Sequence, residues 1–296
     1  MQAGQNEPRI PRTWEANLVV AIVLILAMIG GAAFALAGNF SAMIFAQAII
    51  ILPAIVWIAI RRYPVRATLH LYPINWRIAA WSAIIGLACW PAVAGMAALF
   101  ERGLKLIGPG PGIIPPTGWA ESIIYAFVLI ILAPWTEEPV FRGFVLSAWM
   151  RRGIALGLVM SGFLFALVHF QLAGLVPLTL LAIALGILVQ QSSSLYASII
   201  AHACYNIVGA LYIIIPSLRE TPDQSLIIAG AIALPIAILL LWAFTRRFPA
   251  SAESASPPET SAWIWTVLSL LVVLLISGLV AVGEVTLRLS PNLVGS

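Results

Sequence analysis

The chain has 296 residues, of which 62% are hydrophobic and only 9% are charged. A soluble domain carries about 25% charged residues, so these charges are too few to cover a soluble fold of this length. The composition excludes a cytosolic globular enzyme, a disordered chain and a nucleic-acid-binding protein. A mean hydropathy of +1.04 favours a polytopic helical protein embedded in a lipid bilayer.

The net charge of +4 and the two cysteines indicate no particular partner or site. Basic excess in a membrane protein usually lies in cytoplasmic loops, so the charge does not indicate a nucleic-acid partner. Cys89 and Cys204 lie in apolar stretches far apart in the sequence. We expect both to be small buried hydrophobic residues, and neither a disulfide framework nor a thiolate metal site follows from them.

Long apolar runs rich in Leu, Ile, Ala and Val recur along the chain. A helix needs roughly 20 such residues to cross the hydrocarbon core of a bilayer. The runs therefore predict an all-α fold, a polytopic transmembrane helical bundle of about eight or nine spans. The expected spans are 17–37, 42–60, 78–100, 123–150, 154–170, 174–190, 194–215, 225–245 and 262–282.

The distribution of Lys and Arg predicts the orientation of the chain. If the N-terminus lies inside, the inner loops hold Arg9, Arg12, Arg61, Arg62, Arg66, Arg77, Arg151, Arg152, Arg246 and Arg247, and the outer side holds Arg102, Lys105, Arg219 and Arg288. Cytoplasmic loops are the ones enriched in basic residues. We therefore expect a multi-pass protein of a bacterial or archaeal plasma membrane with a cytoplasmic N-terminus.

Loops divide the chain into three regions. Residues 1–119 hold three spans and an interfacial connector, in which His70 is expected to be solvated or at headgroup level. Residues 120–215 form a membrane core. Residues 216–296 hold two spans joined by the polar linker 248–260, which sets the last span apart.

Three charged residues lie inside an apolar span instead of at its ends. Glu137, Glu138 and Arg142 fall near the middle of the run from 123 to 150, where each charge costs about 2.5–3.5 kcal/mol. Glu138 and Arg142 are spaced i, i+4 and can pair along one helix face. A structural ion pair explains these two but leaves Glu137 without a partner. Pro134 and Pro139 predict a kink in this helix.

Two of the three histidines also lie in apolar spans. His169 ends the segment FALVH, and His202 shares a helix face with Asn206. A lone histidine in a membrane often makes only an interhelical hydrogen bond. Together with the carboxylates, however, these groups could activate a water molecule and donate hydrogen bonds to an oxyanion. The sequence contains neither a serine nucleophile elbow nor the HExxH motif of zinc peptidases.

Three motifs carry a family resemblance. Glu137 to Arg142 matches EExxxR, Phe165 to His169 matches FxxxH, and His202 to Asn206 matches HxxxN. In this order, on successive membrane segments, they resemble the CAAX-protease and bacteriocin-processing family of intramembrane glutamic proteases, relatives of the Ras-converting enzyme. The resemblance covers about residues 120–215.

The resemblance implies a role for each motif residue. Glu137 and His169 would activate the water, and His202 and Asn206 would form the oxyanion hole. Supporting residues would be Glu138, Arg142 and Phe165. The site would open to the cytosol, without a metal or other cofactor, and would take a membrane protein or peptide, possibly its C-terminal tail.

Two other classes of function remain open at this point. A metal-dependent hydrolase could use Glu137, His169 and His202 as ligands, although it would leave Asn206 without a role. A transporter or an immunity-type scaffold could keep the polar cluster for structure or proton relay. Straight helices would also place His169 deeper in the membrane than the other motifs, so tilted or broken helices are required.

Overall fold

A computed structural model describes residues 9–37, 42–110, 115–250, 259 and 263–290 of the chain. The elements are α1 (Thr13–Ala37), α2 (Ala42–Arg61), α3 (Val65–Thr68), α4 (Trp76–Leu104), α5 (Trp119–Phe127), η1 (Val128–Leu132), α6 (Ala133–Glu138), η2 (Pro139–Val145), α7 (Leu146–Met150), α8 (Ile154–Leu167), α9 (Leu175–Ser192), α10 (Leu195–Ile214), α11 (Pro216–Arg219), α12 (Asp223–Arg247) and α13 (Trp263–Leu289). The segments η1 and η2 are π-helical turns within one continuous helix.

The prediction of an all-α membrane bundle is confirmed over the described residues. Seven helices are long and apolar enough to cross a membrane, and two shorter apolar helical stretches, Thr13–Ile29 and Ile154–Leu167, accompany them. The count agrees approximately with the eight or nine spans expected. Helix α8 ends at Leu167 and not at residue 170, so His169 lies beyond its helix.

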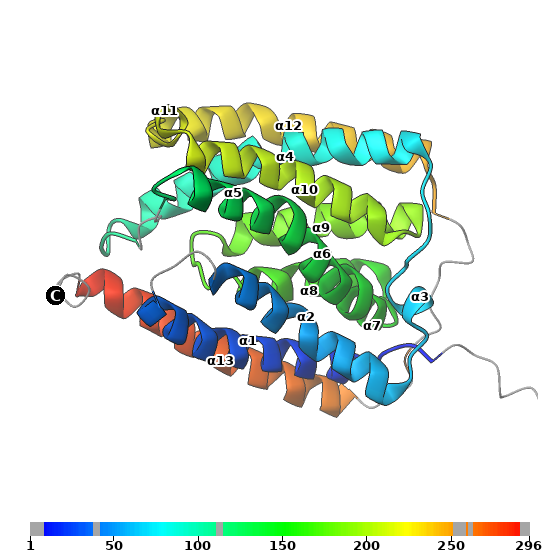
Figure 1. The fold of residues 1–296 in the computed structure, drawn as a ribbon. Helices are drawn as coiled ribbons and strands as arrows, with labels where there is room; N and C mark the ends of the chain where they lie inside the picture. The colour runs from blue at the N-terminus through cyan, green and yellow to red at the C-terminus, as the bar shows by residue number, and fades with distance from the viewer. Residues whose placement is uncertain (1–8, 38–41, 111–114, 251–258, 260–262, 291–296) are drawn as a thin grey trace, which may run out of the picture.

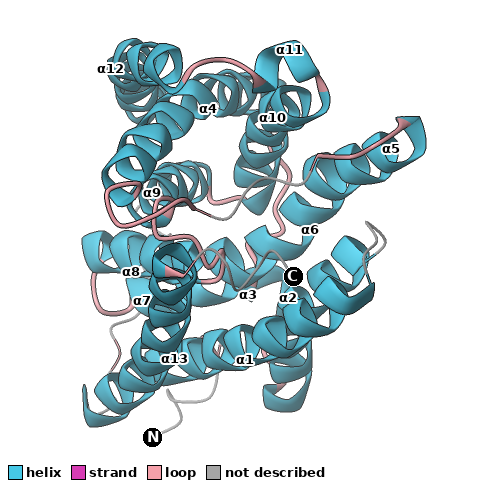
Figure 2. Ribbon diagram, turned by 90° about the vertical axis from the view of Figure 1, so that its left-hand side faces the viewer, coloured by secondary structure: helices cyan, strands magenta, loops and turns pink. Residues whose placement is uncertain are grey.

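The helices run roughly parallel or antiparallel to one another in two groups (Figures 1 and 2). Helices α1, α2 and α13 lie on one side, and α4, α9, α10 and α12 lie on the other. The broken helix α5–α7 and the short α8 run between the two groups. The segments that carry the three motifs therefore lie on or beside the central layer of the bundle.

Two glycines allow helices of the second group to approach closely. A Cβ at Gly86 of α4 would lie 2.0 Å from the carbonyl oxygen of Ala201 on α10, and a Cβ at Gly95 would lie 2.6 Å from the Cα of Gly230 on α12. Contacts this short allow no side chain at either position. Small residues at such crossings are how membrane helices bring their backbones together, and here they allow α10 and α12 to lie against α4.

Ion pairs tie the helix ends together at both ends of the bundle. At one end, Arg61, the last residue of α2, pairs with Glu15 on α1 at 2.8 Å. At the other end, Lys105 pairs with Asp223 at 2.8 Å, where α4 ends and α12 begins. The sets of basic residues that the sequence assigns to opposite membrane faces thus belong to opposite ends of the bundle (Figure 1).

The helix from Trp119 to Met150 is continuous, yet it changes register twice. In η1 the N–H of Ala133 bonds the carbonyl of Val128, which is an i to i+5 pattern. The next carbonyl, that of Leu129, would require the N–H of Pro134, and proline has none. A second π-helical turn begins at Pro139. The two prolines thus coincide with local π-helical register, and π-helical turns are, like prolines, a recognised cause of helix kinks.

Candidate active site

The first motif lies at the centre of the bundle, where α6 passes into η2. Glu137 and Glu138 end α6, and Arg142 lies in η2. The side chains of Glu138 and Arg142 are fully buried, and Glu137 is 6% exposed. Three ionisable groups are thus enclosed within one span, where each must find its compensation inside the protein.

Arg142 is held between an anion and an aromatic ring. Its Nη1 lies 3.1 Å from Oε1 of Glu138, which is the i, i+4 pair expected from the sequence. On the other side its guanidinium carbon lies 4.2 Å from the centre of the Phe165 ring, in cation–π geometry. Phe165, the first residue of FxxxH, therefore supports the charged part of the first motif.

His202 lies between the two glutamates. Its Nδ1 is 2.8 Å from Oε1 of Glu138, and its Nε2 is 4.0 Å from Oε2 of Glu137. The sequence did not predict that Glu138 would contact His202, because one-dimensional spacing shows only the pair with Arg142. The third motif is thus joined directly to the first.

Asn206 lies one helical turn beyond His202 and bonds a backbone carbonyl. Its Nδ2 donates to the Leu129 oxygen at 2.7 Å, the carbonyl that the π-helical register and Pro134 leave without a helical donor. Its side chain is nearly buried, at 9% exposure. This bond fixes one N–H of the amide and leaves the second N–H and the amide oxygen for other partners.

His169 lies in the turn after α8, and its ring lies against Phe165. The ring centres of the two residues are 4.6 Å apart, and the Phe165 ring is in turn 6.1 Å from that of His202. The Nδ1 of His169 is 2.9 Å from the carbonyl oxygen of Phe165. A carbonyl only accepts, so Nδ1 carries the proton, and the neutral ring presents Nε2 as a base. His169, two residues beyond the end of α8, therefore lies close to the first and third motifs through the Phe165 ring.

Sequence reasoning missed two polar residues that contact the site. The amide nitrogen of Gln47, on α2, donates to Oε1 of Glu137 at 3.5 Å, and the Gln47 oxygen accepts a hydrogen bond from the Thr136 hydroxyl. Gln47 interrupts an otherwise apolar run from residue 42 to residue 60. An isolated amide in a membrane span is itself an indication of a functional site. The span that contains Gln47 carries none of the three motifs, so the sequence did not connect it with Glu137.

No group of three His, Cys, Asp or Glu side chains suited to holding a metal ion occurs among the residues that the structure describes. Glu137 and His202 approach each other to 4.0 Å, and the rings of His169 and His202 both lie near that of Phe165. The three residues considered as ligands thus surround the site without converging on one point.

A family comparison agrees with the motifs. Residues 119–208 match the model of a family described as type II CAAX prenyl endopeptidase Rce1-like. The matched segment runs from the start of α5 into α10 and contains EExxxR, FxxxH and HxxxN in full. No curated protein and no solved structure matches the chain. Over residues 119–208, therefore, this multi-pass membrane protein is similar to the Rce1-like family of CAAX proteases.

Proposed function

We propose that the protein is an intramembrane endopeptidase that hydrolyses a peptide bond of a membrane-associated protein or peptide. One observation carries the proposal. Glu137 and His202, from two motifs 65 residues apart, face each other at 4.0 Å inside a buried part of the bundle. A carboxylate and an imidazole at this separation can act on the two sides of one reacting carbonyl.

Glu137 and His169 are the proposed activators of water. The Glu137 carboxylate accepts a proton from the water as the oxygen attacks the peptide carbonyl carbon. The unprotonated Nε2 of His169 holds the same water by accepting its other hydrogen. The proton taken by Glu137 then passes to the leaving amine, so that the carboxyl group serves first as base and then as acid.

His202 and Asn206 are the proposed oxyanion donors. Glu138 is compensated by Arg142, so its Oε1 accepts from an Nδ1–H on His202. The Nε2 of His202, on the side of Glu137, is the proposed donor to the oxyanion. The free N–H of Asn206 adds a second donor to the developing negative charge.

The proposed orientation follows the basic residues. The end of the bundle that carries Arg61 and Arg247 faces the cytoplasm, and the site opens toward that side. A C-terminal tail of a cytoplasmic or membrane protein is the substrate class that this arrangement favours. The source membrane that we propose is a bacterial or archaeal plasma membrane.

The test uses the purified full chain in liposomes with a farnesylated CAAX peptide and its unprenylated counterpart. Mass spectrometry should find a cleaved tail with the natural chain and none with Glu137→Ala. Proteome termini that fail to mature in cells carrying Glu137→Ala would identify the physiological substrate. Equal cleavage by both chains, or failure of the natural chain on every prenylated and unprenylated peptide tried, would contradict the proposal.

A further inference from the structure

The last helix ends in a buried network of charges. Glu284 and Arg288 lie one turn apart on α13 and are 8% and 2% exposed. The Arg288 Nη2 lies 2.7 Å from Oε1 of Glu284 and 2.7 Å from Oε2 of Glu101 at the end of α4, and its Nη1 is 2.9 Å from Oε1 of Glu101. Such bidentate pairing fixes the direction of the guanidinium, so α13 is anchored and is not the separate span that the linker suggested.

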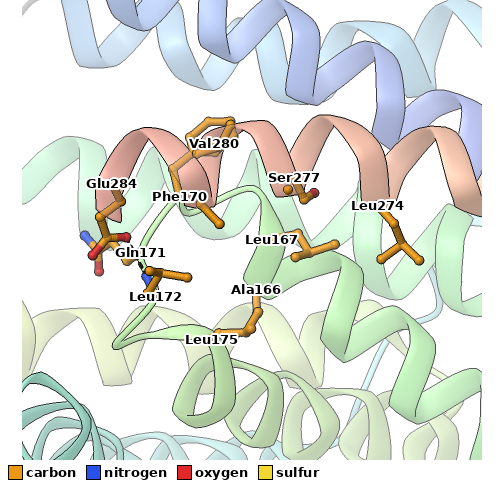
Figure 3. Close-up of a pocket in the computed structure, with 12 residues that line it drawn as sticks. Ala166, Leu167, Phe170, Gln171, Leu172, Leu175, Leu274, Ser277, Val280 and Glu284 are labelled. Carbon is orange, nitrogen blue, oxygen red and sulfur yellow. Dashed lines mark hydrogen bonds between the residues drawn. The ribbon is translucent and has the colours of Figure 1, made fainter. Parts of the chain in front are cut away.

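The same glutamate reaches the turn that carries His169. The second oxygen of Glu284, Oε2, accepts a hydrogen bond of 2.8 Å from the backbone N–H of Leu172 (Figure 3). Leu172 follows His169 by three residues, in the connection between α8 and α9. A charged acceptor makes this a strong bond for a backbone donor, and Arg288 holds the acceptor in place.

The backbone of this turn is strained next to His169. Phe170 has a φ of 52°, in the left-handed region that a residue with a side chain adopts at a cost. Beside the turn, Leu167 and Phe170 face Leu274 and Val280 of α13 across a pocket of about 220 Å³ (Figure 3). Apolar packing therefore does not fill the space between the turn and α13, and the bond from Leu172 to Glu284 crosses it.

We propose that Glu284 is a positioning residue for His169. The carboxylate holds Leu172, Leu172 holds the left-handed turn at Phe170, and the turn sets where the His169 ring lies against Phe165. Helix α13 lies outside the matched segment 119–208, so an additional helix completes the support of the site. This inference rests on the role proposed above for His169 in water activation.

The experiment compares three variants of the full chain in nanodiscs. Glu284→Met removes the acceptor for Leu172 and leaves Arg288 paired with Glu101. Glu101→Met is the matched control, because it leaves Arg288 paired with Glu284 and keeps the bond to Leu172. Glu284→Gln retains an acceptor oxygen and tests rescue.

Two readouts are taken from each variant. The ring signals of His169 are observed by NMR of protein labelled with ¹⁵N-histidine, and they are assigned among three histidines by their loss in His169→Gln. Turnover of the farnesylated CAAX peptide gives kcat and KM separately. We expect Glu284→Met to shift or broaden the His169 signals and to lower kcat by about ten- to a hundredfold with little change in KM. Glu101→Met should stay near the natural chain, and Glu284→Gln should recover most of the loss.

Several outcomes would overturn the proposal. Unchanged His169 signals in Glu284→Met would do so, as would equal effects of the two Met variants, which indicate only a general anchoring of α13. Shifted signals with unchanged kcat would also overturn it. If the natural chain cleaves no peptide, the proposed function fails, and the His169 signals alone then decide whether Glu284 positions the ring.

Discussion

At the scale of single residues, the two adjacent glutamates have different surroundings. Glu138 contacts both Arg142 and His202, whereas Glu137 faces His202 at 4.0 Å and accepts a bond from Gln47. Glu138→Gln leaves the buried Arg142 without its anion, and breaking such a pair costs about 3–5 kcal/mol. We expect this variant to lose thermal stability first, with activity falling as a consequence.

Glu137→Gln should behave in the opposite way. The amide keeps the volume of the side chain and removes the proposed base, so turnover should be lost while the melting temperature in detergent stays near that of the natural chain. Both variants are measured for melting temperature and for peptide cleavage. An active Glu137→Gln beside a well-folded but inactive Glu138→Gln would mean that the two roles are reversed.

Gln47 is expected to act through Glu137. Its oxygen is bound by the Thr136 hydroxyl, which turns its amide nitrogen toward the carboxylate. Gln47→Leu should lower kcat about tenfold, whereas Thr136→Ser keeps the hydroxyl and should be close to neutral. Thr136→Val should lower kcat nearly as much as Gln47→Leu. The double variant should be no worse than either one, because both changes act through the amide of Gln47 at Glu137. Additive losses in kcat would show that the two residues act independently.

At the scale of secondary structure, the π-helical turn and Asn206 depend on each other. The Leu129 carbonyl is available to Asn206 because Pro134 has no N–H to bond it. Pro134→Ala supplies that N–H within the helix. We expect an equal or higher melting temperature together with turnover lowered about tenfold, because the Asn206 amide loses its orienting partner. Unchanged turnover in Pro134→Ala would show that this bond does not orient the amide.

The connector between α2 and α4 contains a half-buried histidine, His70, which we expected to be solvated or at headgroup level. Nε2 of His70 donates to the Ser147 hydroxyl at 2.9 Å, since that hydroxyl itself donates to the Thr68 carbonyl. Burial lowers the pKa of His70 below its usual 6.5. The folded protein therefore binds fewer protons at this residue than the unfolded chain does.

The consequence is a stability that depends on pH. The contribution of His70 is fully present above pH 6.5 and is lost as the pH falls from there through the lowered pKa of the folded state. Melting temperatures in detergent between about pH 5 and pH 8 should fall on the acid side in the natural chain. His70→Gln should reduce this fall in melting temperature at acid pH. An equal fall in both proteins would show that His70 is not its cause.

At the scale of the whole molecule, the two ends of the bundle are chemically distinct. One end of the bundle holds the C-terminal ends of α2 and α12, each with two adjacent arginines. The other end holds the C-terminal ends of α4 and α13, which Arg288 and Glu101 join (Figure 1). Val65 and Leu106 are 52% and 90% exposed, one at each end. Single cysteines at these two positions, in a chain without Cys89 and Cys204, should be labelled from opposite sides of the membrane by an impermeant thiol reagent. Labelling of both from one side would overturn the proposed topology.

The class of the protein and the polar residues buried in its core could be predicted from the amino-acid sequence. A long apolar run is sufficient to predict a membrane helix, because the bilayer requires every backbone group to be bonded within its own segment. The same solvent makes buried charges costly, so Glu137, Glu138 and Arg142 were conspicuous in an apolar span. The pair of Glu138 with Arg142 was predictable because it lies within a single helical turn.

Only the tertiary structure decided which groups from separate helices meet. Three hydrogen bonds join residues that are 64, 90 and 112 positions apart in the chain. They link His202 to Glu138, Gln47 to Glu137, and Leu172, in the turn after His169, to Glu284. Helical periodicity relates side chains within one segment and says nothing of which face meets which neighbour. The position of His169 beyond a short α8 and the π-helical register at Pro134 likewise follow from how backbone groups are satisfied in three dimensions.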